Sequence, residues 1–216
     1  MLIIQDIHVV RGREELPFED RYRTEIAPAL QGIGAQLLYF GWAPHGAGQG
    51  YEAIVLTALK DADALHAYQE NLRIGDLSEV WAKIEGAHHF AESRLLVTVG
   101  PMPTPSSTPV GDGPRSLFRL DTIKVAGSVM AAAETVADSV TSNENDVFEP
   151  LGVFAPAMGD LEAAEITVFS RVRSFELFRT ALEDLDSSSW PGMVSAPGEI
   201  DRSVRISRCT TFSPIH

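Results

Sequence analysis

Five of the six histidines and all four tyrosines lie in the first half of this 216-residue chain. The histidines are His8, His45, His66, His88 and His89, and the tyrosines are Tyr22, Tyr39, Tyr51 and Tyr68. Histidine is the side chain best suited to take up a proton near neutral pH, and a tyrosine hydroxyl can assist it by hydrogen bonding. The second half has no tyrosine, and its one histidine is His216. These side chains predict a proton-transfer site in the first half of the chain.

The first candidate pair lies in the opening segment, LIIQDIHVV. This segment is rich in β-branched residues and reads as a strand, in which Asp6 and His8 share a face because side chains alternate. An aspartate beside a histidine can raise its pKa and orient its ring. We therefore predict His8 as a catalytic base with Asp6 beside it. The alternative is a buried, hydrogen-bonded histidine with a purely structural role.

A second candidate group flanks the Gly-rich segment PHGAGQG, which we expect to form a hairpin loop. His45 could act as the base here, with Tyr51 as its hydrogen-bond partner. Trp42 would offer an apolar wall on which an aromatic ligand could stack. The alternative is a surface hairpin with a solvated histidine.

A third group follows a helical stripe over residues 77–88, where Trp81, Ile84 and His88 recur at helical spacing. Trp81 would be a pocket wall and His88 a substrate-binding residue. A histidine on an apolar helix face can also bind haem iron, or simply pack in a core or an interface. The sequence has no HExxH, CxxC or GxSxG motif, so we predict no metal and no cofactor, with haem as the alternative.

The chain contains an internal repeat. QDIHVVRG, from Gln5, aligns with LDTIKVAG, from Leu120, and places Asp6 over Asp121 and His8 over Ile123. An aromatic followed by Ala-Pro comes next in both copies and places Trp42 over Phe154. Residues 52–72 then align without a gap with residues 165–185. Because the aspartate recurs and the histidine does not, we interpret the aspartate as structural and His8 as the specific residue.

Each copy is predicted to run strand, helix, strand, strand, helix, strand. The expected units are residues 1–100 and 115–216, joined by a Pro-, Gly- and Ser-rich linker over 101–114. Phe18, Tyr22 and Ile26 mark the first helix, which Pro28 should kink or end. Asp61 is the expected N-cap of the second helix. The first copy has an extra helix over 77–88, whereas the Pro and Gly residues of 186–199 forbid one in the second copy.

The pattern βαββαβ is ferredoxin-like, and two such units in tandem resemble the dimeric α/β-barrel superfamily. The segment ALKDADALHAYQ is similar to the strand-to-helix signature of that superfamily, at Asp61, Ala64, Leu65 and Tyr68. VWAKIEGAHHFAESRLLVTV resembles the NIPSNAP branch. The resemblance implies an α+β fold in which two sheets come together in a barrel. It also implies the functions known there: cofactor-free monooxygenases on polyketides, small-molecule lyases and isomerases, haem enzymes, and proteins without assigned activity.

Composition excludes several kinds of partner. A net charge of −13 argues against a nucleic-acid partner, which would require a basic surface. No apolar run reaches the roughly 18 residues of a membrane span, and the opening residues lack the features of a signal peptide. The single Cys209 excludes an internal disulfide and favours a reducing, cytoplasmic location.

The sequence therefore predicts a cofactor-independent enzyme acting on a small, apolar, aromatic or polyketide-like compound. Proton abstraction would lead either to oxygenation by a monooxygenase or to lysis or isomerisation. One alternative is a non-catalytic ligand-binding or interaction module, and another is a haem-binding enzyme. The expected partner is a small apolar molecule, and a homo-oligomer is compatible with the resemblance.

Overall fold

The computed structural model describes residues 1–43, 51–103, 116–142, 146–157, 164–183 and 194–215. The chain divides into two compact units. Unit 1 comprises Met1–Leu96, Thr104–Arg115 and Ser207–His216, and unit 2 comprises Val97–Pro103 and Ser116–Ile206. The C-terminal ten residues thus belong with the first copy of the repeat.

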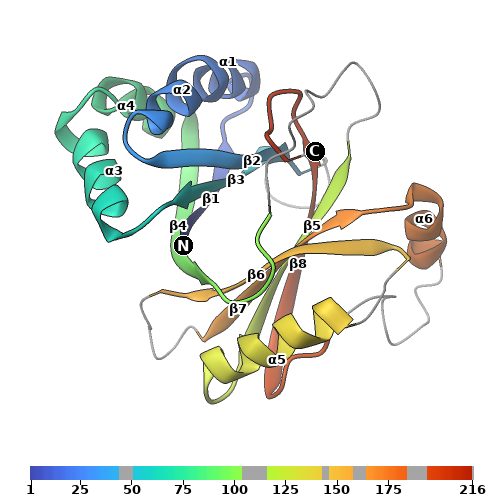
Figure 1. The fold of residues 1–216 in the computed structure, drawn as a ribbon. Helices are drawn as coiled ribbons and strands as arrows, with labels where there is room; N and C mark the ends of the chain where they lie inside the picture. The colour runs from blue at the N-terminus through green and yellow to red at the C-terminus, as the bar shows by residue number, and fades with distance from the viewer. Residues whose placement is uncertain (44–50, 104–115, 143–145, 158–163, 184–193, 216) are drawn as a thin grey trace. The chain divides into compact units, whose positions relative to one another are not determined.

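Unit 1 has a four-stranded sheet whose order is β4, β1, β3, β2, the ferredoxin-like order (Figure 1). Its strands are β1 (Leu2–Val10), β2 (Ala35–Trp42), β3 (Tyr51–Leu59) and β4 (His88–Thr98). The Gly-rich segment between β2 and β3 lies outside the described residues. On the far side of β2, Trp42 and Gly41 pair with the end of the chain at Arg208 and Cys209.

Three consecutive helical segments follow β1, namely α1 (Glu15–Arg21), η1 (Tyr22–Ile26) and α2 (Ala27–Gln31). Phe18, Tyr22 and Ile26 are buried at helical spacing, as predicted. The middle segment is a π-helix, which ends just before Pro28. Proline has no N–H to donate, and its ring clashes with the carbonyl four residues earlier in an α-helix, so the widened turn accommodates it. Pro28 therefore distorts the helix without ending it.

Two more helices, α3 (Ala62–Ile74) and α4 (Ser78–Ala87), lie between β3 and β4. The Asp61 side chain accepts a hydrogen bond from the Ala64 N–H at 2.9 Å, which confirms the predicted N-cap. The extra helix is confirmed as α4. However, His88 is not part of it, because this residue has extended backbone angles and begins β4.

Unit 2 repeats the arrangement, with the strand order β8, β5, β7, β6. Its elements are β5 (Leu117–Val125), α5 (Val129–Ser142), β6 (Phe148–Pro156), β7 (Glu165–Val172), α6 (Phe175–Glu183) and β8 (Glu199–Cys209). Of the segment 186–199, which was expected to lack a helix, residues 186–193 lie outside the described residues. Both units are α+β and ferredoxin-like, which confirms the predicted fold class.

Strand register shows how closely the units match. Asp6 faces Val55 in unit 1, and Asp121 faces Val168 in unit 2, as the sequence alignment requires. The register between the hairpin strands shifts at Leu38 in unit 1 and at Leu151 in unit 2. A bulge that recurs at the same place is strong evidence for the repeat, because bulges are specific local features of a sheet.

The same register corrects one part of the sequence alignment. Gly41 faces Ile54 and Phe154 faces Thr167, so Phe154 corresponds to Gly41 and not to Trp42. Aligning the Ala-Pro pairs slips the strand by one residue, which turns every side chain to the opposite face. The glycine and the aromatic have in fact exchanged places. In unit 1 the Tyr39 side chain covers Gly41, and in unit 2 the Phe154 ring covers Gly152.

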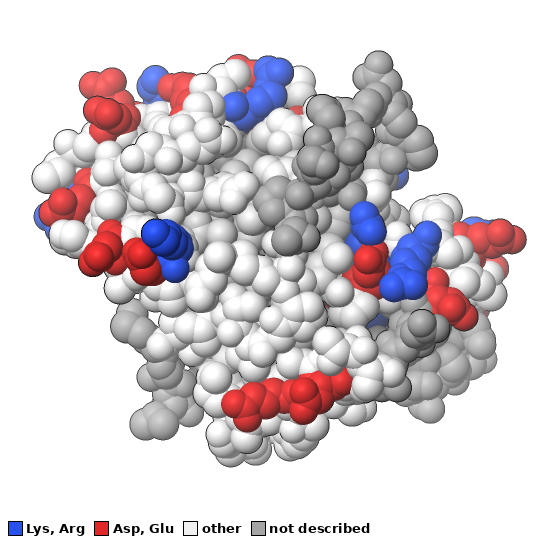
Figure 2. All heavy atoms as spheres, viewed as in Figure 1, with Lys and Arg blue, Asp and Glu red and all other residues white. Residues whose placement is uncertain are grey.

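The helices of unit 1 pack on one face of its sheet. Ile4 and Val10 of β1, together with Phe40 of β2, contribute to this core and are 6 % exposed or less. Figure 2 shows acidic and basic side chains next to each other over much of the visible surface, and a row of acidic side chains without basic ones near its lower edge. Among the described helices, none is both long and apolar enough to span a bilayer.

Candidate functional site

A buried chain of polar rings links β1, η1 and β4 in unit 1. His8 is 1 % exposed, and its Nε2 atom lies 3.1 Å from the Tyr22 hydroxyl. Its Nδ1 atom lies 3.3 Å from Nδ1 of His88. His88 is only half-buried, so the chain runs from the core of unit 1 to its surface.

Local structure brings these three rings together. Alternation along β1 directs Asp6 and His8 to the same face as Ile4 and Val10, which pack against the helices. Tyr22 is the first residue of the π-helix η1, and such widened turns are frequent at functional sites. His88 reaches the cluster because α4 ends at Ala87 and the chain turns into β4.

Aromatic side chains surround His8. The Phe18 ring meets it edge to face at 5.1 Å between centroids, and Trp81 of α4 does so at 6.2 Å. Trp81 is half-buried and, like His88, lies where the cluster meets the surface. The cluster thus combines hydrogen-bonding rings with apolar ring surface, as sites for aromatic ligands do.

Burial keeps the histidines neutral. Burial, and to a smaller extent the nearby His88, lowers the pKa of His8 to about 3. Burial also lowers the pKa of His88, while Glu85 raises it and Arg11 lowers it. We expected Asp6 to raise the pKa of His8, and this is wrong, because desolvation of a charged imidazole dominates.

Neutral rings allow two directions of hydrogen bonding along the chain. In one, Tyr22 donates to His8 Nε2, His8 Nδ1–H donates to His88 Nδ1, and His88 carries its remaining proton on Nε2. In the other, every proton shifts, so that His88 Nδ1–H donates to His8 and His8 Nε2–H donates to Tyr22. His88 Nε2 is then a free acceptor at the exposed end, which is the form that a general base requires.

Asp6 is a buried carboxyl within the same layer and is 4 % exposed. Burial raises its pKa to about 6, and a hydrogen bond with Ser93 of β4 opposes that change. Burial raises the pKa of Tyr22 and that of Tyr68 well above the usual range, and the charge of Asp6 raises both further. Both hydroxyls therefore keep their protons, whereas the Asp6 carboxyl changes charge near pH 6.

The other predicted residues lie apart from this chain. Trp42 packs against Phe18, but its indole N–H donates to the Glu19 carboxylate at 2.7 Å. Tyr51 faces Val10 across the strands, and a hydrogen bond with Glu15 raises its pKa. His45 lies outside the described residues. The structure therefore brings together Asp6, His8, Trp81 and His88, and places Trp42 and Tyr51 elsewhere.

Sequence reasoning missed the tyrosine that bonds to His8. Tyr22 was counted among the tyrosines of the first half and placed on a helical stripe, where a buried aromatic signals packing, but it was not assigned a role in the site. The sequence feature that could have identified it is its hydroxyl, the one polar group on the stripe formed by Phe18, Tyr22 and Ile26. Tyr68, which belongs to the strand-to-helix signature, was likewise not assigned to the site.

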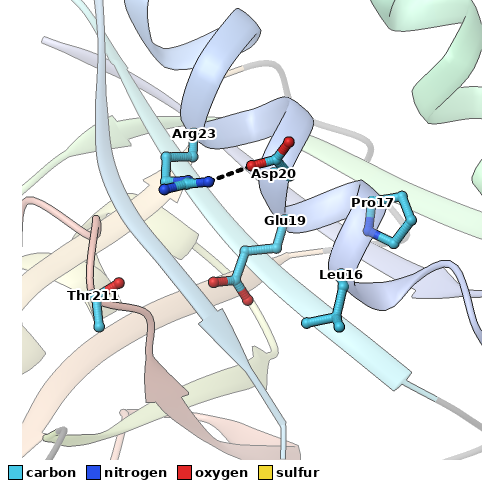
Figure 3. A pocket seen from close by; sticks show the side chains of 6 residues that line it. All are labelled: Leu16, Pro17, Glu19, Asp20, Arg23 and Thr211. Carbon is cyan, nitrogen blue, oxygen red and sulfur yellow. Dashed lines mark hydrogen bonds and ion pairs between the residues drawn. The ribbon is translucent and has the colours of Figure 1, made fainter.

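A surface pocket of about 580 Å³ lies between α1 and the C-terminal segment of unit 1 (Figure 3). The Glu19 side chain points from α1 toward Thr211, and Asp20 pairs with Arg23 on its rim. A second pocket of about 340 Å³ shares Arg23 and extends along α2. Across the described residues, no group of three or more His, Cys, Asp or Glu side chains could hold a metal ion.

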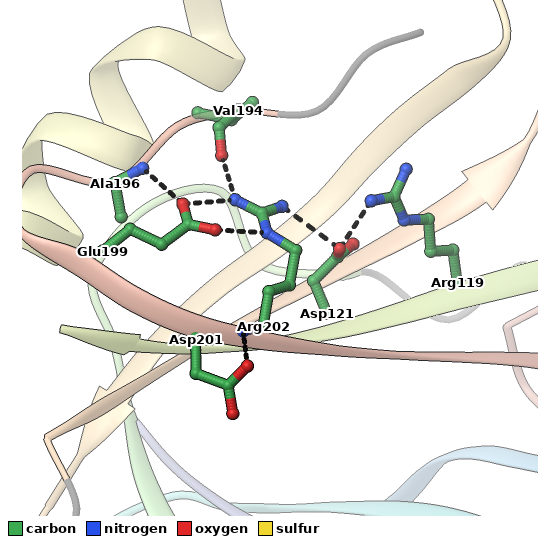
Figure 4. A network of polar contacts seen from close by, with 7 residues as sticks. All are labelled: Arg119, Asp121, Val194, Ala196, Glu199, Asp201 and Arg202. Carbon is green, nitrogen blue, oxygen red and sulfur yellow. Dashed lines mark hydrogen bonds and ion pairs between the residues drawn. The ribbon is translucent and has the colours of Figure 1, made fainter. Parts of the chain in front are cut away.

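Unit 2 has a different arrangement at the matching position. Asp121 accepts hydrogen bonds from Arg119 at 2.5 Å and from Arg202 at 3.2 Å (Figure 4). Arg202 is fixed in turn by Glu199 and by the Val194 carbonyl. Where unit 1 has neutral rings around an aspartate, unit 2 has an ion-pair network.

Comparison with solved structures identifies the fold. A candidate monooxygenase from Fusobacterium nucleatum superposes with a TM-score of 0.60 at 9 % identity, over 96 % of this chain and 91 % of its own. A candidate monooxygenase from Lactobacillus acidophilus gives 0.56 at 11 % identity, over 99 % and 97 %. An anthrone oxidase-like protein gives 0.58 at 9 % identity, over 97 % and 91 %. The chain has the dimeric α/β-barrel fold.

This confirms the resemblance inferred from the two βαββαβ patterns. No protein-family description matches the sequence, and no curated protein matches it. The finer likeness to the NIPSNAP branch stays a prediction. Identities of 9–11 % carry the fold and not the reaction.

Proposed function

We propose that unit 1 is the active unit of a cofactor-independent enzyme that removes a proton from a small aromatic or polyketide-like compound. The observation that carries this proposal is the chain Tyr22–His8–His88, which joins a buried hydroxyl to a half-buried imidazole. A ligand would meet this chain at His88 and Trp81, the two members that reach the surface.

The chemistry begins with His88 Nε2 accepting a proton from a carbon next to a carbonyl or on a phenol-like ring. The electrons left on carbon are delocalised into the substrate itself, so the protein needs no bound electron sink. For a substrate CH₂ group, the carbanion adds O₂ to form a hydroperoxide. Loss of the second C–H proton then breaks the O–O bond, and the products are a ketone and one molecule of water. O₂ is the oxidant, and one of its atoms stays on carbon.

One line of evidence supports oxygenation over a reaction without O₂. Structures with the same fold are named as candidate monooxygenases, and another is named as anthrone oxidase-like. The half-buried ring of Trp81 beside His8 supports a flat aromatic substrate, whichever reaction follows. If a substrate is converted without oxygen uptake, the same proton abstraction serves an isomerase or a lyase.

The test is a screen of aromatic ketones, anthrones and phenols that records oxygen uptake and product mass. Once a substrate is found, His8→Ala and Tyr22→Phe should each lower kcat/KM about 10²-fold or more, the usual contribution of general-base catalysis. Ile123→Ala is the matched control for His8→Ala, because it occupies the corresponding strand position in unit 2. Tyr39→Phe is the control for Tyr22→Phe, because it removes another buried hydroxyl, which is bonded to Ser207 at 2.7 Å.

Different results point to different conclusions. Full activity in both His8→Ala and Tyr22→Phe would refute the site assignment. Tight binding of aromatic compounds without turnover would favour the alternative of a ligand-binding module.

A further inference from the structure

The surface pocket between α1 and the C-terminal segment is distinct from the proton-transfer site. Its lining comes from α1, from the start of η1 and from the C-terminal segment, all of which belong to unit 1. None of the side chains that line it belongs to the chain Tyr22–His8–His88. Its volume of about 580 Å³ is within the usual range of small-molecule sites.

The charges that line this pocket do not cancel. Two carboxylates, Glu19 and Asp20, and one guanidinium, Arg23, are present. Asp20 and Arg23 form an ion pair on the rim. Glu19 has no cationic partner among the residues that the structure describes, and its carboxylate accepts a hydrogen bond from the Trp42 indole. The pocket therefore carries one uncompensated negative charge, at Glu19.

Trp42 fixes the Glu19 carboxylate without neutralising it. The indole N–H donates to Oε2 at 2.7 Å, so Oε1 is left to accept a bond from a ligand. The Trp42 ring is itself held by Phe18 and Phe40, with centroids 6.0 and 5.6 Å away. Figure 3 shows the Glu19 side chain directed from α1 toward Thr211. A charged group that is already in place loses little conformational freedom when a ligand binds.

The rest of the lining is uncharged and consists of Leu16, Pro17 and Thr211. Leu16 is 78 % exposed, so its side chain is available to cover an apolar ligand group. The Thr211 hydroxyl can accept one further hydrogen bond. The pocket thus combines one fixed negative charge, one neutral acceptor and apolar surface.

We propose that this pocket binds an organic amine, with its ammonium group on Glu19 and Thr211 and its apolar group against Leu16 and Pro17. An ammonium supplies the positive charge that the pocket lacks and donates to both acceptors, whereas an anion would be repelled and a neutral ligand would leave the charge uncompensated. A metal ion does not fit, because no group of three or more His, Cys, Asp or Glu side chains of the described residues could hold one. This binding site is additional to the proposed function and does not depend on it.

The test uses benzylamine as the probe, and benzyl alcohol as a neutral compound of the same shape. The NMR signal of the Trp42 indole N–H, identified by its loss in Trp42→Phe, reports on the pocket because this group is bonded to Glu19. Benzylamine should shift the signal and saturate below about 10 mM. Benzyl alcohol should bind at least about tenfold more weakly, since it cannot form a charged hydrogen bond.

A matched pair of variants locates the charge that binds the amine. Glu19→Gln keeps an oxygen for the Trp42 indole but removes the charge, and should weaken benzylamine binding at least about tenfold. Glu25→Gln removes an acid of η1 that lies near Lys83 and does not line the pocket, and should leave binding unchanged. This control separates the pocket from the general attraction of a chain with a net charge of −13 for cations.

A third variant should act in the opposite sense. Arg23→Gln removes the cation that pairs with Asp20, and should strengthen benzylamine binding about threefold. The Arg23 side chain is 56 % exposed, so this substitution leaves the core intact. No saturable shift with benzylamine, equal affinity for benzyl alcohol, equal affinity in Glu19→Gln, or weaker binding in Arg23→Gln would each overturn the inference. Any of these results leaves the proposed proton transfer at His88 untouched.

Discussion

Replacing the two equivalent aspartates with asparagine should change stability in opposite directions. Asp6→Asn exchanges a buried carboxyl, which has no ion-pair partner among the described residues, for a neutral group of the same shape. Asp121→Asn removes the carboxylate that holds two buried guanidinium groups. The substitutions are chemically identical and lie at corresponding strand positions, so each serves as the control for the other.

The magnitude for Asp6 follows from its pKa, which is about 6 in the fold against an ordinary value of 3.8. Because the folded state binds this proton more tightly than the unfolded chain, stability falls as the pH rises between about 4 and 6. A pKa difference of about two, at 1.36 kcal/mol each, costs about 3 kcal/mol once the pH exceeds 6. Asparagine does not ionise, so the Asp6→Asn variant buries no charge at any of these pH values. It should be about 3 kcal/mol more stable than wild type at pH 8, and within about 1 kcal/mol of wild type at pH 4.

For Asp121 the sign reverses. Removing one partner of a buried ion pair typically costs about 3–5 kcal/mol, since it leaves a buried charge without its counter-ion. Arg119 is 2 % exposed and cannot reach solvent without a change in packing. We expect Asp121→Asn to lose stability throughout the same pH range.

Urea denaturation followed by circular dichroism and tryptophan fluorescence, at pH 4, 6 and 8, measures these free energies. Two of the three tryptophans, Trp42 and Trp81, belong to unit 1, and Trp190 falls in the range of unit 2, so fluorescence reports both units with the larger number of probes in the unit that contains Asp6. The reasoning is refuted if Asp6→Asn is less stable than wild type at pH 8, or if their difference does not change with pH. A stabilised Asp121→Asn would refute the structural role of the ion pairs in unit 2.

Two further predictions concern packing and cofactor binding. Gly41→Ala should lower stability by about 1–3 kcal/mol in thermal denaturation, because its Cβ would lie 2.0 Å from the Tyr39 hydroxyl oxygen. In the double variant Gly41→Ala/Tyr39→Ala the clash is relieved, but the loss of the buried Tyr39 ring lowers stability by more than this relief restores. The loss of stability should therefore be smaller than the sum of the losses in the two single variants. Equality with that sum would contradict the contact between Gly41 and Tyr39. Added hemin should give no Soret band that depends on His88, since a porphyrin would have to displace the rings packed around His8. A band lost in His88→Ala would instead establish the haem alternative.

The sequence was sufficient to predict the fold because the fold is encoded locally and twice. The β-branched run in 2–10, the helical stripe through Phe18 and Tyr22, and the N-cap at Asp61 are short-range patterns, and the structure has a strand, buried helical residues and a cap at these places. Reliance on local patterns also caused the error in aligning Trp42 with Phe154. The two Ala-Pro pairs match in sequence, but the register of β2 on β3 is fixed by burial on both faces and by a bulge at Leu38.

The site was less predictable because its contacts are long-range. Composition pointed to the half of the chain that holds the ring cluster, and alternation put Asp6 and His8 on one face. Nothing in the local pattern could show that His88, 80 residues away, meets His8 through Nδ1. The Trp42–His45–Tyr51 group was proposed because its members are close in sequence, yet Tyr51 and Trp42 pair with acidic residues of the first helix region.

The two aspartates show most clearly which information the sequence alone does not contain. Because Asp6 and Asp121 match and His8 and Ile123 do not, the aspartate was interpreted as structural and the histidine as functional. That reasoning assumes that identical residues have identical surroundings. In unit 2 the surroundings include Arg202, which lies 81 residues beyond Asp121 and forms an ion pair with its carboxylate. In unit 1 the same carboxyl is buried with a hydrogen bond to Ser93, so its charge costs free energy and responds to pH. Identity at one position of a repeat therefore says which backbone is shared, and only the side chains packed against that position decide whether an ionised carboxylate stabilises or destabilises the fold.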